Sequence, residues 1–170
     1  MSSTTNGFTI TGEFAGDHFG RAIVGLSDFN GDGINDFAVG ADNFNSDGGK
    51  VYIIFGSASP TWPLIFSASI IGSSVAGLQA VGPQNSKLGF ALTAGDFDHD
   101  GLSDVAGGAM GISEVLVIYG SPNSNGAFGT IFRGNSSSDA GNNIAAVMRF
   151  NGKNVDDLKR PVFIDVSVFN

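Results

Sequence analysis

The sequence contains no cysteine. Disulfide bonds, thiol catalysis and thiolate metal sites are therefore excluded together. Histidine is nearly absent as well, with only His18 and His99, so a site built for zinc or copper is not expected. If the chain binds a metal ion, we expect oxygen atoms to be the ligands.

Positive charge and long apolar runs are also scarce. Eight Lys and Arg face sixteen Asp and Glu, which gives a net charge of −8, and a nucleic-acid partner would favour the opposite sign. No apolar run reaches about eighteen residues, so we expect no transmembrane helix. Residues 1–7 lack the basic and apolar regions of a secretory signal, so we expect no such signal, and the residues leave the compartment unknown.

Motifs of common catalytic centres are missing too. There is no Gly-x-Ser-x-Gly turn, no HExxH helix and no phosphate-binding Gly-Lys-Ser/Thr. Asp17 beside His18 is the one suggestive pair, and we interpret both histidines as bystanders. The sequence thus predicts that the chain is not an enzyme, with a hydrolase as the weakest alternative.

Glycine, by contrast, is abundant, with 26 residues. It separates short apolar runs such as 22–26, 37–39 and 51–55, which are rich in β-branched and aromatic residues, as strands are. No segment keeps a helical stripe over three turns. We therefore predict an all-β chain.

The strands belong to an internal repeat. Residues 19–41 align with residues 88–109 with a one-residue gap, and each copy is followed by an apolar run that ends in Gly-Ser. A weaker third copy covers residues 141–158. We predict one domain, 1–170, made of three units at about 8–60, 65–122 and 128–170.

Each of the first two units contains an acidic nine-residue loop. A loop that wraps one calcium ion directs oxygen atoms inward from positions 1, 3, 5, 7 and 9, with a glycine near position 6 for the bend. The predicted metal ligands are Asp28, Asn30, Asp32, the Ile34 carbonyl and Asp36 in the first loop, and Asp96, Asp98, Asp100, the Leu102 carbonyl and Asp104 in the second. Gly33 and Gly101 stand at the bends. The sequence predicts two Ca²⁺ ions, the alternative being that these clusters only form turns.

These loops differ from an EF-hand, because Val39 and Gly107 replace the glutamate at position 12. The third copy carries Arg149 and Lys153 where ligands are expected, so we predict no calcium there. Either a cation of this loop pairs internally with Asp157, or the terminal repeat has simply decayed.

The repeat resembles the FG-GAP repeats of integrin α-subunit β-propellers. The resemblance rests on Phe19-Gly20 and residues 38–41 around the first loop, and on Leu88-Gly89 and residues 106–109 around the second. It implies four-stranded blades with the calcium loop in a hairpin, and an extracellular or cell-surface setting. Propellers close with about four to eight blades, so three units are too few to form a ring. A fragment, an open stack and self-association are the alternatives, and we expect self-association because an open stack would expose apolar faces.

The function we predict is that of an integrin-like module for protein or glycan interaction or cell adhesion, with calcium in a structural role. A truncated remnant, or a calcium buffer without a partner, is the alternative.

Overall fold

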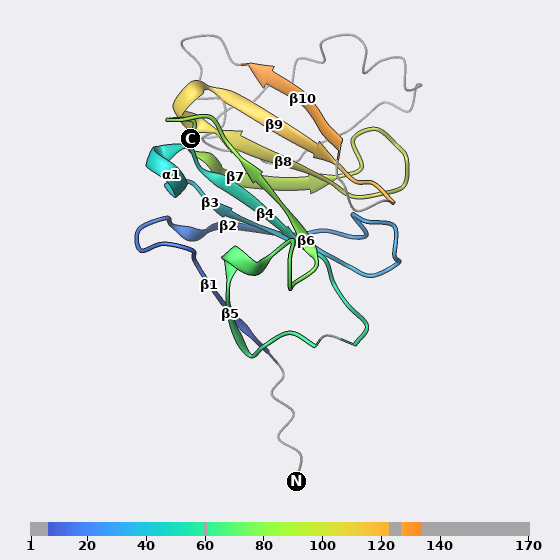
Figure 1. Cartoon of the computed structure of the whole chain (residues 1–170). Coiled ribbons are helices and arrows are strands. Elements are labelled where there is room, and N and C mark those ends of the chain that lie inside the picture. The colour runs from blue at the N-terminus through green and yellow to red at the C-terminus, as the bar shows by residue number, and fades with distance from the viewer. Residues whose placement is uncertain (1–6, 60, 123–126, 134–170) are drawn as a thin grey trace, which may run out of the picture.

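The computed structural model describes residues 7–59 and 61–122, together with the backbone of residues 127–133 (Figure 1). Most of the third predicted unit, including the Arg149, Lys153 and Asp157 loop, lies outside the described residues. The described part of the chain is mostly β, as predicted.

The first sheet contains four antiparallel strands in chain order. They are β2 (Phe19–Gly25), β3 (Phe37–Ala41), β4 (Lys50–Ile54) and β6 (Gly77–Val81). A bulge interrupts the β2–β3 register between Phe19 and Ile23. All five residues of β4 are buried, which explains the apolar run from Val51 to Ile54 that follows Lys50.

The second sheet repeats this arrangement. Its strands are β7 (Leu88–Gly95), β8 (Asp104–Ala109), β9 (Glu114–Tyr119) and β10 (Ala127–Arg133). The bulge recurs at the same place, between Leu88 and Leu92. The structure thus confirms antiparallel blade-like sheets, and in the part of the chain that it describes they form no closed ring.

The two sheets stack face to face, with β7 against β2 and β3 (Figure 1). The buried residues between them are Leu26, Phe29, Ala38, Val51, Ile53, Phe55, Ala80, Leu88, Val105, Ala109 and Ile118. At the inner edge the backbones touch, since a Cβ built on Gly89 would lie 2.9 Å from the Gly40 Cα. Only glycines permit this approach.

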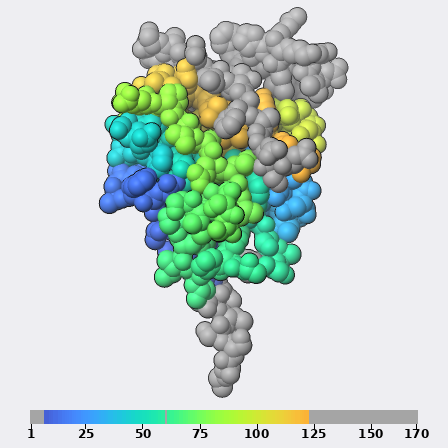
Figure 2. Space-filling view, in the orientation of Figure 1, coloured from blue at the N-terminus to red at the C-terminus, as the bar shows by residue number. Residues whose placement is uncertain are grey.

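A third layer covers the other face of the first sheet. Strands β1 (Thr9–Thr11) and β5 (Ile65–Ser67) pair in parallel, and the 3₁₀ turn η1 (Ala68–Ile70) follows. We call residues 9–11 and 62–75 the cap. Its apolar side chains bury Val39, Tyr52 and Ile54, and its green segment forms the lower part of the molecule in Figure 2.

Two short turns connect the middle strands. The helical segment α1 (Phe44–Asp47) lies between β3 and β4, and the 3₁₀ turn η2 (Met110–Ile112) lies between β8 and β9. In α1, Asn45, Ser46 and Asp47 have φ of 50°, 56° and 61°. Three consecutive left-handed residues are unusual outside glycine. Backbone hydrogen bonds hold this turn, from the N–H of Gly49 to the Phe44 carbonyl at 2.9 Å and from the N–H of Lys87 to the Asp47 carbonyl at 2.7 Å. Among the described residues no helix is long and apolar enough to cross a membrane.

Candidate metal sites

Both acidic loops connect the first two strands of a sheet. Residues 28–36 lie between β2 and β3, and residues 96–104 lie between β7 and β8. The predicted bends are confirmed, because φ is +82° at Gly33 and +90° at Gly101. The loops therefore share one path although their side chains differ.

In each loop the aspartate at position 9 connects two parts of the hairpin through hydrogen bonds. Asp36 accepts hydrogen bonds from the N–H groups of Phe29 at 2.8 Å and Gly56 at 2.7 Å. Asp104 accepts them from Phe97 at 2.6 Å and Gly120 at 2.8 Å. The same carboxylate thus joins the start of its loop to the chain after the third strand.

The sequence did not assign Gly56 and Gly120 to these sites, although their N–H groups hold the position-9 carboxylates. A Cβ on Gly120 would lie 2.8 Å from the Ser103 carbonyl oxygen, so a larger residue would push the N–H away from Asp104. The signal was present in the Gly-Ser that ends both apolar runs.

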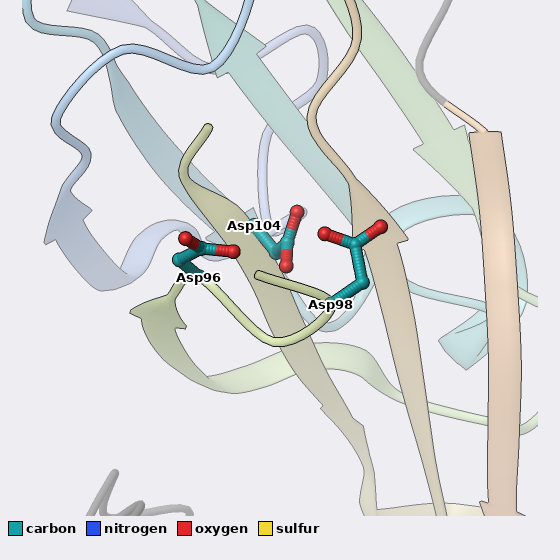
Figure 3. A group of neighbouring side chains, drawn as sticks. All are labelled: Asp96, Asp98 and Asp104. Atoms are coloured by element: carbon teal, nitrogen blue, oxygen red, sulfur yellow. The ribbon is translucent and has the colours of Figure 1, made fainter. Parts of the chain in front are cut away.

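In the second loop three carboxylates surround one space (Figure 3). Oxygen atoms of Asp96, Asp98 and Asp104 all lie within 4.8 Å of one another. Asp96 Oδ1 is buried and has no hydrogen-bond partner among the described residues. A buried carboxylate oxygen without a partner is costly, and a bound cation would satisfy it. The donor set fits a hard cation, so this acidic triad could hold a metal ion.

The other predicted ligands of this loop lie outside the triad. Asp100 is exposed, and its Oδ1 accepts a hydrogen bond from the N–H of Leu102 at 2.8 Å. Ligation by Asp100 and by the Leu102 carbonyl stays a prediction.

The first loop gathers its carboxylates less closely. Both oxygens of Asp28 accept loop N–H groups, from Gly31 at 2.6 Å and Gly33 at 2.7 Å. Asn30 Nδ2 donates to Asp32 Oδ2 at 3.1 Å. Among the described residues this loop forms no group of three acidic side chains like that in the second loop. Metal ligation by Asp28, Asn30, Asp32, Ile34 and Asp36 stays a prediction.

Burial makes the negative charge of these loops unfavourable. It raises the pKa of Asp104 to about 6 from an ordinary 3.8, and it also raises the pKa of Asp36. Burial raises the pKa of Asp98 too, and the charge of Asp100 adds to this. A bound cation would offset both the burial of the carboxylates and the repulsion between them.

His18 and its neighbour Asp17 interact with different partners. The Asp17 carboxylate accepts the N–H groups of Glu13, Phe14 and Phe19. The exposed His18 instead places Nδ1 3.2 Å from Asp42 Oδ1. Asp17 therefore shapes a turn and does not orient the imidazole.

A buried charged cluster was not predicted at all. Lys50 Nζ lies 2.5 Å from Glu13 Oε1, and the Tyr52 hydroxyl donates to the same oxygen at 2.8 Å. Lys50 also lies over the Phe44 ring, 4.3 Å from its centroid. Burial and then Glu13 raise the pKa of Tyr52. The cluster links the residues before β2 to β4, and nothing in the spacing of Glu13 and Lys50 signals their contact.

Comparison with known families agrees with this geometry. The FG-GAP repeat family model matches residues 19–54, which run from β2 through the first acidic loop to the end of β4. No curated protein matches the chain. Residues 19–54 are therefore an FG-GAP repeat.

Proposed function

We propose that the chain is a calcium-binding FG-GAP module in which the ion has a structural role. The observation that carries this proposal is the buried, unpartnered Asp96 Oδ1, grouped with Asp98 and Asp104. Calcium prefers six to eight oxygen ligands, and carboxylates, carbonyls and water supply them in flexible geometry. Magnesium would ask for a stricter octahedron.

The proposal includes two ions, with the second loop as the stronger site. Asn30 occupies in the first loop the position that Asp98 occupies in the second, so the first loop offers one carboxylate fewer. Calcium affinity rises with the number of charged ligands. We therefore expect the first loop to fill at higher calcium concentration.

A titration of ion-free protein tests this assignment. Calcium should raise the melting temperature by mass action, and Asp98→Ala should remove most of that rise. Asp47→Asn is the matched control, because it removes one negative charge outside both loops. An unchanged melting temperature on adding calcium to protein shown to be ion-free would contradict the proposal.

We also propose that the module binds a protein or glycan partner, as adhesion modules do. An open cleft of about 610 Å³ supports this, with Phe14, Phe44, Asn43 and Asn45 among its lining residues. The Phe14 side chain is 65% exposed there, and exposed aromatic rings beside amides suit sugar rings and peptide side chains. Glycan arrays and peptide display, with Phe14→Ala as the variant, test this step. A calcium buffer or a remnant without a partner would yield no binder that depends on Phe14.

Self-association stays a further proposal. Gly89 in the second sheet packs against Gly40 of the first sheet. Its counterpart Gly20 has no such neighbour among the described residues, because no atom lies within 4 Å of a Cβ added there. Ile23, on the same edge strand, is 67% exposed. A second copy could supply the missing neighbour, and light scattering of wild type and Ile23→Asp tests it. A monomeric wild type at high concentration would overturn the idea.

A hydrolase is the alternative with the least support. It would need His18, held by Asp42, to act as a base. Loss of a hydrolytic activity in His18→Ala would revive it.

A further inference from the structure

The two acidic loops are joined to each other by backbone hydrogen bonds. The N–H of Ser103, in the second loop, donates to the carbonyl of Asp28, in the first, at 2.7 Å. The N–H of Ser121, just after β9, donates to the carbonyl of Phe29 at 2.9 Å. Backbone hydrogen bonds therefore connect the two candidate sites.

These bonds complete a path between the two position-9 carboxylates. The Asp104 carboxylate accepts a hydrogen bond from the N–H of Gly120. The N–H of the next residue, Ser121, donates to the Phe29 carbonyl. The N–H of the same Phe29 donates to Asp36. Asp104 and Asp36 are thus connected through two peptide segments and no flexible side chain.

Close packing joins residues 120–122 to the first loop. Phe29 is fully buried and its ring lies over that of Phe55. A Cβ on Gly120 would come within 2.9 Å of the Phe29 carbonyl oxygen, and one on Gly31 within 3.2 Å of the Pro122 Cα. A shift of residues 120–122 must therefore move the first loop as well.

We propose that the two calcium sites are positively coupled, so that an ion in the second loop raises the affinity of the first. The coupling rests on the proposed calcium binding. An ion that fixes Asp104 also fixes Gly120 and Ser121, which orders the Phe29 carbonyl and the start of the first loop. The first loop then loses less conformational freedom when it binds, and the effect is reciprocal. Couplings of this kind are on the order of 5- to 150-fold in affinity.

Calorimetric titration with calcium measures the coupling directly. Asp98→Ala leaves only the first site, and Asp32→Ala leaves only the second. The product of the two stepwise association constants of wild type should exceed the product of the two single-site constants by on the order of tenfold. Equal products, or binding of only one ion by wild type, would overturn the proposal.

A second pair of variants tests the route. Ser121→Pro removes the N–H that donates to Phe29, whereas Ser121→Ala keeps it. The excess should therefore fall in Ser121→Pro, where the bond from Ser103 to Asp28 remains, and persist unchanged in Ser121→Ala. If Ser121→Pro fails to fold in a melt, Pro122→Gly serves instead, because it removes the packing against Gly31 and should reduce the excess. An excess that is unchanged in the folded variant would overturn the route.

The outcomes separate this proposal from the one on which it rests. Two ions that bind independently would leave the calcium assignment intact and remove the coupling. Absence of any calcium binding would remove both.

Discussion

Gly89 of the second sheet lies directly against Gly40 of the first, and each occupies space that a Cβ on the other would need. A Cβ on Gly89 would also lie 2.7 Å from the Lys50 carbonyl oxygen. Gly89 has a φ of +88° as well, which favours glycine. Two glycines from the two aligned units of the sequence, Gly40 and Gly89, therefore meet across neighbouring sheets.

Replacing either glycine should loosen this junction. We expect Gly40→Ala and Gly89→Ala each to lower the free energy of unfolding by about 1–3 kcal/mol, because backbone cannot move aside as a side chain can. Gly25→Ala is the matched control, since nothing lies within 4 Å of its added Cβ. Chemical denaturation measures the difference, and equal losses in all three variants would contradict the prediction.

The aspartates of the second loop should separate into two classes. Asp104→Ala leaves the N–H groups of Phe97 and Gly120 without their acceptor, at about 1–3 kcal/mol for each unsatisfied group, with and without calcium. Asp98→Ala should cost stability only in calcium, because without the ion it relieves repulsion. Denaturant melts in calcium and in chelator measure both effects. An Asp104→Ala loss confined to calcium would contradict the structural role.

The stability of the ion-free protein should rise as the pH falls from about 7 to 4. Burial raises the folded-state pKa of Asp104 to about 6, above the ordinary 3.8 expected in the unfolded state. Between these values the folded state binds more protons than the unfolded state, so protonation favours folding. Calcium competes with that proton, so the stabilisation by calcium should shrink over the same range. Melts of dialysed protein at pH 5 and 7.5, with and without calcium, measure both trends. A calcium effect that does not depend on pH would contradict the assignment of Asp104.

The Glu13–Lys50 pair should show strong energetic coupling. The two side chains are only 12% and 5% exposed, so removing one leaves the other charge buried. We expect Glu13→Gln or Lys50→Met to cost about 3–5 kcal/mol, and the double variant to cost clearly less than their sum. A double-mutant cycle by denaturation measures this coupling, and simple additivity would show that Tyr52 and solvent satisfy each charge alone.

The sequence predicted the parts of the fold that follow from local patterns. Strand-length apolar runs and the glycine bends at Gly33 and Gly101 are local, and the structure has them. It also has the first two units of the repeat as two similar sheets, whereas most of the third unit lies outside the described residues. The cap was missed because β1 and β5 are three residues long and pair across half of the described chain. The Glu13–Lys50 contact was missed for the same reason.

Both candidate sites were predicted with ligands at the same five loop positions, and the sequence shows only that the first loop has one carboxylate fewer. The difference between them depends on where the side chains turn. Asn30 bonds to Asp32, whereas Asp98 lies with Asp96 and Asp104. The backbone bond from Ser103 to Asp28 crosses between repeats, so no pattern within one repeat could reveal it.

The cap has a consequence for any partner on that side of the first sheet. The cap already buries Val39, Tyr52 and Ile54, so an incoming sheet would have to displace the cap. Binding there becomes an exchange of one packing for another, as in domain swapping, and its free energy is the difference between the two. The short β1–β5 ladder, three residue pairs long, is the segment that such an exchange would open first.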